Sequence, residues 1–92
     1  MHLEIVSPEA TLFSGEVTSV IVPGTSGAFQ MLNNHAPIVS TLKEGTVTIY
    51  GKMDLDSSVK NKFKQIDANT TLFEISSGAV EMRNNKLILL AD

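Results

Sequence analysis

Residues 16–32 read EVTSVIVPGTSGAFQML, and this stretch decides the fold class. Val20 and Val22 fall on one side of an extended chain and Ile21 on the other, which is the two-residue period of a β-strand. The next four residues, Gly24–Gly27, consist only of turn-forming types. The stretch therefore predicts a strand that ends in a tight turn.

A second apolar segment follows that turn and contains Phe29, Met31 and Leu32. We expect these side chains to belong to a core strand. The alternative is that some of them are exposed, in which case they form an apolar contact patch on the surface.

The same alternation recurs along the rest of the chain, with many β-branched residues. Seven or more short strands at this spacing predict an all-β sandwich or barrel. The further expected strands are Leu3–Val6, Thr46–Gly51, Thr71–Ile75, Ala79–Met82 and Lys86–Leu90.

Two connections have the composition of hairpin turns. Residues 43–45 lie between two strand patterns, and we expect a hairpin there in which Gly45 takes a positive φ angle. Asn84 and Asn85 separate the last two strands, and asparagine tolerates the left-handed region, so they predict a two-residue hairpin turn.

The segment from Asp54 to Asn69 breaks the strand pattern. Val59, Phe63 and Ile66 have the spacing i, i+4 and i+7, which suits a short helix near residues 56–66 capped by Asp56 or Ser57. The alternative is an irregular strand that contains Phe63 and Ile66.

The composition limits the protein classes that fit. The chain has 92 residues, 42% of them apolar, which suits one domain with one core and predicts a single β-sandwich domain over residues 1–92. The net charge is −3 and the basic residues are mostly dispersed, which argues against nucleic acid as the main partner. There is no cysteine, no signal-peptide pattern and no apolar run of membrane-spanning length.

The stretch NNHAPIVS (residues 33–40) raises the question of catalysis because it contains one of only two histidines. A catalytic histidine needs a nucleophile and an orienting group, and no motif supplies them to His35. We interpret the stretch as a rigid corner. Asn33 and Asn34 turn the chain, Pro37 fixes its own φ angle, and Ile38-Val39 are expected to anchor the corner in the sandwich.

Metal and phosphate sites are also not indicated, and we expect no metal and no cofactor. His2 and His35 are far apart in sequence, and the acidic pair Asp54 and Asp56 lacks the remaining ligands of a calcium loop. The glycines fit neither a P-loop nor a dinucleotide fingerprint. The lysines at 60, 62 and 64 most simply form a solvated face.

The order of the segments is more informative than any one motif. The family of F-type ATP synthase epsilon subunits, whose mitochondrial counterpart is called delta, has an amino-terminal β domain with the motifs V-x-P/A-E, F-x-G-x-V, V-P-G-x-x-G-x-F/L, H-A/T-P-L/I-V/L and L-x-x-G. The chain resembles this domain in that order, at Val6–Glu9, Phe13–Val17, Val22–Phe29, His35–Val39 and Leu42–Gly45. The end of the chain is similar to the family's closing pattern at Ser77, Gly78, Glu81, Asn85 and Ala91-Asp92.

The chain also departs from the family pattern in three places. Gln30 stands where the family usually has glycine, and Lys52–Asn69 is longer than the usual hairpin there. The family typically continues into two antiparallel helices, whereas this sequence ends at Asp92, so we expect no C-terminal helical hairpin.

The resemblance implies a flattened sandwich of about ten short strands in two sheets. It also implies a non-catalytic central-stalk (rotor) subunit of a proton-translocating F-type ATP synthase that couples c-ring rotation to ATP synthesis. The implied partners are the gamma subunit and the c-ring, with the catalytic alpha/beta hexamer contacted indirectly, no nucleic acid, and the membrane only through the complex. The implied location is the cytoplasmic face of the bacterial inner membrane.

The same resemblance suggests which residues meet the partners. The loop from Gly24 to Leu32 is expected to contact the c-ring, and the remaining candidates to face gamma or the ring. The candidate interface residues are Ser7, Gly24, Gly27, Ala28, Phe29, Gln30, Met31, His35, Pro37 and Ser40. The alternative function is a stand-alone ligand-binding β-sandwich module, which the scarcity of aromatic residues disfavours.

Overall fold

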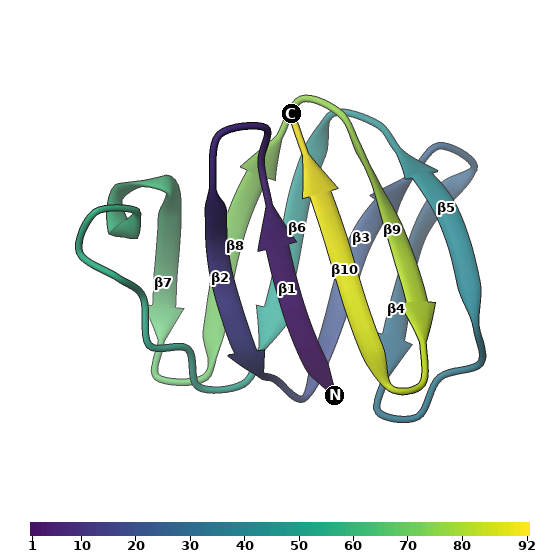
Figure 1. The fold of residues 1–92 in the computed structure, drawn as a ribbon, viewed down its shortest axis with the longest axis horizontal. Coiled ribbons are helices and arrows are strands. Elements are labelled where there is room, and N and C mark those ends of the chain that lie inside the picture. The colour runs from purple at the N-terminus through teal and green to yellow at the C-terminus, as the bar shows by residue number, and fades with distance from the viewer.

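The computed structural model describes residues 1–92 and is built almost entirely of β-strands (Figure 1). The strands are β1 His2–Val6, β2 Thr11–Glu16, β3 Ser19–Gly24, β4 Gly27–Leu32, β5 Ile38–Leu42, β6 Gly45–Tyr50, β7 Phe63–Asp67, β8 Thr70–Ile75, β9 Gly78–Arg83 and β10 Lys86–Ala91, with one short 3-10 helix, η1 Lys60–Lys62. The predicted all-β sandwich of about ten strands is confirmed.

The strands form two layers that face each other. Layer one has the order β2-β1-β10-β9-β5, and layer two has the order β4-β3-β6-β8-β7 (Figure 1). The layers belong to one curled sheet because β3 and β5 pair at a single position, Gly24 with Leu42. The pair β1 and β10 is parallel, and every other pair is antiparallel.

The core fills the space between the layers with alternate residues of each strand. Val20 and Val22 are fully buried, as their spacing predicts. Leu3, Leu87 and Leu89 meet them from layer one and are also fully buried. A cluster of 21 buried apolar residues results, and this burial supplies the main driving force for folding.

Two of the predicted turns are confirmed. The residues between Gly24 and Gly27 form a two-residue connection, in which Gly27 has a φ of 132°. Asn84 and Asn85 have φ values of 52° and 58° and join β9 to β10. Positive φ at both central residues is characteristic of a type I′ two-residue hairpin turn, which applies to the Asn84-Asn85 turn.

The prediction for residues 43–45 is wrong on both points. The strands β5 and β6 do not pair with each other, because β5 joins β9 while β6 lies between β3 and β8. The φ angle of Gly45 is not positive. A Cβ atom at Gly45 would lie 2.9 Å from the Cβ of Pro23, so glycine is needed there for close approach to β3.

The predicted helix near residues 56–66 is also wrong, and the alternative of an irregular strand is confirmed. Only η1 is helical, and Phe63 begins β7, whose register to β8 shifts between Gln65 and Asp67. The ring of Phe63 stacks on that of Phe73 with centroids 4.8 Å apart. Pairing with β8 and this buried contact outweigh the local helical spacing.

Candidate docking surfaces

The outward face of layer one carries two of the four large apolar side chains that are exposed, and the other two, Leu32 and Ile66, lie on layer two. Val39 is 76% exposed and Leu90 is 51% exposed. The prediction that Val39 anchors the sandwich is therefore wrong: Val39 pairs with Glu81 and points outward, while its neighbour Ile38 packs against the core. Because successive residues of a strand face opposite sides, only one of the two is able to serve as an anchor.

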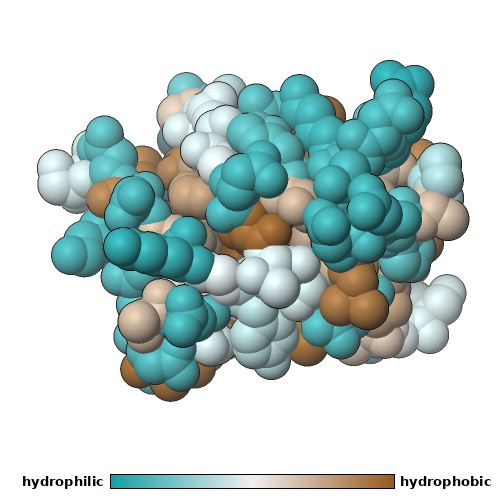
Figure 2. Space-filling model, turned by 90° about the horizontal axis from the view of Figure 1, so that it is seen from below, coloured by the Kyte–Doolittle hydropathy of each residue, from teal (hydrophilic) through white to brown (hydrophobic).

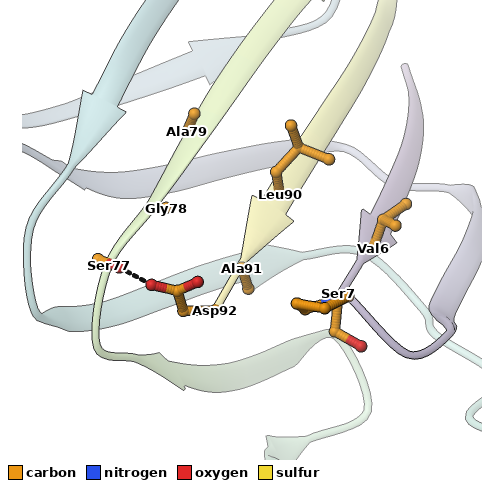
Figure 3. A pocket seen from close by; sticks show the side chains of 9 residues that line it. Val6, Ser7, Ser77, Gly78, Ala79, Leu90, Ala91 and Asp92 are labelled. Atoms are coloured by element: carbon orange, nitrogen blue, oxygen red, sulfur yellow. Dashed lines mark hydrogen bonds between the residues drawn. The ribbon is translucent and has the colours of Figure 1, made fainter.

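The strand registers place several apolar side chains of this face beside one another. Leu90 lies opposite Ala79 on β9 and opposite Val6 on β1. Figure 3 shows the Leu90 side chain between these two residues. We call the set Val6, Val39, Ala79, Ile88 and Leu90 the outer apolar patch.

A shallow hollow of about 480 Å³ adjoins the patch at the end where β1 and β10 finish (Figure 3). Its polar wall comes from Ser7, Ser77 and Asp92, and the Ser77 hydroxyl donates a hydrogen bond to the Asp92 carboxylate. No aromatic ring lines the hollow, so it lacks the stacking platform of a carbohydrate-binding module. Ser7, one of the predicted interface residues, lies on the rim of this hollow.

The rest of the same face carries charge. Lys86 Nζ lies 3.8 Å from Glu4 Oε1, and Arg83 lies opposite Lys86 on the next strand. Glu81 lies between Val39 and Ile88 of the patch. An apolar patch bordered by charged residues is the usual anatomy of a protein–protein contact area.

The predicted interface residues do not form one surface. Gly24 and Gly27 lie at the end of the molecule where Leu42 and Gly78 pair, whereas His35 and Pro37 lie beyond the other end of β4 (Figure 1). Ser40 lies on β5 and pairs with Val80. The structure therefore separates a turn end and a corner end of β4.

The residues of β4 differ in exposure. Gly27, Ala28 and Gln30 are exposed, whereas Met31 is fully buried. Phe29 is half-buried and packs against the core. Met31 and Phe29 therefore hold β4 in place, and the residues that are free to meet a partner are the exposed ones.

Gln30 replaces the glycine usual in the family, and its Nε2 atom donates to the hydroxyl of Ser19 at 3.1 Å. Ser19 is opposite Leu32 on the neighbouring strand, so the bond runs across the hairpin formed by β3 and β4. The side chain is accommodated on the surface without disturbing the strand register.

His35 has a local contact only. Its Nδ1 atom lies 2.7 Å from the carbonyl oxygen of Ala36, the next residue. With no carboxylate or hydroxyl beside the ring, the geometry gives His35 no nucleophile to activate.

The structure brings together one base–nucleophile pair that the sequence reasoning missed. His2 Nε2 lies 3.2 Å from Ser14 Oγ, and His2 Nδ1 lies 3.1 Å from Glu16 Oε2. The sequence signal for this pair is that Ser14 and Glu16 are two residues apart, so both face the same side of β2. That strand pairs antiparallel with β1, where His2 lies opposite Glu16. The three side chains lie on an open sheet face and line none of the hollows, so no pocket adjoins them that could hold a substrate.

The acidic and basic side chains of the 52–69 segment are solvated. Asp54, Asp56 and the three lysines are exposed. Hydrogen bonds from the backbone N–H and the hydroxyl of Ser58 lower the pKa of Asp56 below its usual value, because they favour the charged carboxylate. No group of three or more His, Asp or Glu residues has the arrangement of a metal site, and no helix is long and apolar enough to cross a membrane.

Comparison with known proteins identifies the family that has this architecture. The family model described as the β-sandwich domain of the ATP synthase delta/epsilon chain matches residues 1–60. An ATP synthase epsilon chain of Chlorobium limicola is 39% identical over 90 residues, which are 98% of this chain and 86% of that protein. The chain belongs to the ATP synthase epsilon family.

Other epsilon chains agree in sequence, and a solved structure agrees in fold. The epsilon chain of Caulobacter vibrioides is 37% identical over 92 residues, which are 100% of this chain and 90% of that protein. That of Campylobacter curvus is also 37% identical, but the match spans 60% of its length. A chain in a Euglena gracilis mitochondrial ATP synthase structure has the same fold, with a TM-score of 0.73 at 13% identity over 97% of this chain and 48% of that one.

Proposed function

We propose that this epsilon-family chain is a non-catalytic rotor subunit of a proton-translocating F-type ATP synthase. It binds the gamma subunit and the c-ring and so couples ring rotation to ATP synthesis. Family membership supports the complex, and the outer apolar patch supports a role in binding, since side chains as exposed as Val39 and Leu90 are stabilised when a partner covers them.

The outer apolar patch is the proposed site for gamma. It is the observation that carries the proposal, because it combines exposed apolar area, an adjoining hollow and a charged border on one face. Ser7 lies on the rim of this site and Ser40 on the strand that carries Val39.

The turn end of β4 is the proposed site for the c-ring. Gly27, Ala28 and Gln30 are exposed there and carry no charge. The corner end, with His35 and Pro37, is a third docking surface that faces gamma or the ring. The alpha/beta hexamer is reached only through gamma, and the subunit is peripheral at the cytoplasmic face of the bacterial inner membrane.

A closed, densely filled core suits such a coupling element. Close-packed interiors have low compressibility and transmit strain between their faces. The core here connects both layers through 21 buried residues, so force applied at one surface reaches the other with little deformation.

The test of the gamma site introduces charge at two exposed positions, so that it changes the surface and not the core. Val39→Glu combined with Leu90→Glu places two carboxylates in the outer apolar patch. The domain should remain folded because both side chains are exposed, but the affinity for the gamma subunit of the same organism should fall at least about 30-fold, since buried unpaired charge is costly. Calorimetric titration of the purified chain with gamma measures this change.

Lys64→Glu on β7 is the matched control, because Lys64 is exposed on layer two and is not part of the patch. Its affinity for gamma should equal that of the unmodified chain. Equal binding by the Val39/Leu90 variant and the unmodified chain would remove the gamma assignment. For the ring, Ala28→Arg should weaken binding of the chain–gamma complex to isolated c-ring without changing the affinity for gamma.

A further inference from the structure

The corner between β4 and β5 is held in place by a residue from a distant turn. The backbone N–H of Asn34 donates to Oδ1 of Asn85 at 2.7 Å. Nδ2 of Asn85 donates to Oδ1 of Asn33 at 3.0 Å. One side chain on the β9–β10 turn therefore makes two hydrogen bonds to the corner, 51 and 52 residues away along the chain.

Packing does not hold this corner. Asn33, Asn34, Ala36 and Pro37 are exposed and His35 is only half-buried. Seen from below in Figure 2, this end of the molecule is largely hydrophilic, with hydrophobic residues visible only in small separate areas. The corner's position is therefore set by its hydrogen bonds rather than by burial.

The local bonds of the corner fix its shape but not its place. Asn34 has a φ of 63°, and the N–H of His35 donates to the carbonyl of Leu32 at 3.0 Å, which closes the turn. Both features lie within the corner itself. The chain here crosses from layer two, which contains β4, to layer one, which contains β5. Only contacts to layer one fix where the turn stands. Asn85 provides two of them, one of which goes to the backbone of Asn34, and the amino terminus at Met1 provides a third by donating to Oδ1 of Asn33 at 2.8 Å.

We propose that Asn85 is a positioning residue for the corner-end docking surface. The inference rests on the proposed function, in which His35 and Pro37 meet a partner subunit. A surface loop that is fixed before binding loses less conformational entropy on association. A corner held by the two hydrogen bonds of Asn85, which we call the Asn85 latch, therefore binds more tightly than a free corner. When only a fraction of molecules has the competent conformation, the apparent affinity falls by that fraction.

The geometry of the β9–β10 turn allows a clean test. Asn84 and Asn85 both have positive φ values, so glycine at either position keeps the turn. Asn85→Gly removes both latch bonds. Asn84→Gly is the matched control because it makes the same chemical change one residue earlier and leaves the latch intact.

Two measurements test the latch and its effect on the affinity for the partner subunits. Amide hydrogen exchange of the free chain should show faster exchange at Asn34 in Asn85→Gly and no change in Asn84→Gly. Binding to the gamma subunit with c-ring should be about fivefold weaker for Asn85→Gly and unchanged for Asn84→Gly. Asn85→Asp keeps an acceptor for the Asn34 N–H but loses the donor to Asn33, so its affinity should lie between those of the other two.

The outcomes separate this inference from the proposed function. If the unmodified chain does not bind gamma and c-ring, the proposed function fails, and the docking role of Asn85 fails with it. If the unmodified chain binds and Asn85→Gly binds equally well, only the positioning role of Asn85 is overturned. Unchanged exchange at Asn34 in Asn85→Gly overturns the latch itself. Equal loss of affinity in both glycine variants also overturns it, because the effect then belongs to the turn.

Discussion

The two ends of β4 present their residues to partners in different ways. At the turn end, Gly24 and Gly27 pair with each other, and the hairpin closes within four consecutive residues. At the corner end, Asn33 and Asn34 are held by Asn85, which is more than 50 residues away, and Asn33 also accepts a hydrogen bond from the amino terminus. The turn end also bonds to β5, where the N–H of Thr25 donates to the carbonyl of Thr41 at 3.1 Å, but its hairpin closes through its own residues. The place of the corner end, in contrast, depends on contacts from distant segments.

This difference indicates which parts of a docking surface tolerate amino-acid substitutions. A local turn keeps its shape as long as its own glycines are present. A corner held from a distance is sensitive to substitutions in a segment that never touches the partner. Between the two ends, the strand itself is held by a buried side chain, Met31.

The largest effect is expected at Met31, which is fully buried one residue before the end of β4. Met31→Ala should lower the free energy of unfolding by about 3 kcal/mol, because it removes buried atoms and leaves a cavity. Denaturant unfolding measures the loss. Leu32→Ala is the control, since Leu32 is 55% exposed and the cost there should be below about 1 kcal/mol. Equal losses at the two positions would show that the core does not anchor this end of β4.

A smaller effect is expected at the turn end. A Cβ atom at Gly24 would lie 2.7 Å from the carbonyl oxygen of Gly27 and 2.8 Å from the Phe29 ring. Gly24→Ala should therefore cost about 2 kcal/mol, since the hairpin has to open. Gly27→Ala should cost about 1 kcal/mol, because its Cβ has free space but its φ of 132° is unfavourable for alanine.

Hydrogen exchange of these two glycine variants tests whether the two ends of β4 are independent of each other. Because the turn bonds only to its own strands and to the adjoining end of β5, faster exchange should stay within β3, β4 and that end of β5 and should not reach the amide of Asn34. A change at Asn34 comparable to that at the turn would mean that the two ends of β4 are coupled and that the distinction between them is wrong.

The features that the sequence predicted correctly are those that depend on neighbouring residues. The alternation of Val20 and Val22, the turn at Gly24–Gly27 and the hairpin at Asn84-Asn85 all follow from period and turn chemistry. The family resemblance rested on the order of such local signals, and the fold agrees with it.

The features that the sequence did not predict depend on which strands become neighbours. Gly45 was assigned to a hairpin, but its role is close approach to Pro23 on β3. Val39 was assigned to the core, but its register with Glu81 turns it outward and makes it part of the outer apolar patch. The latch at Asn85 requires two turns to meet, and no local pattern contains that information.

The central claim is that layer one carries the gamma-binding surface, and side-chain footprinting of the chain free and bound to gamma tests it most directly. Val39 and Leu90 on layer one are exposed, and so is Ile66 on β7 of layer two, which is 57% exposed. The account predicts that gamma protects Val39 and Leu90 from hydroxyl-radical oxidation and leaves Ile66 as reactive as in the free chain. Protection of Ile66 with Val39 and Leu90 unchanged would contradict it.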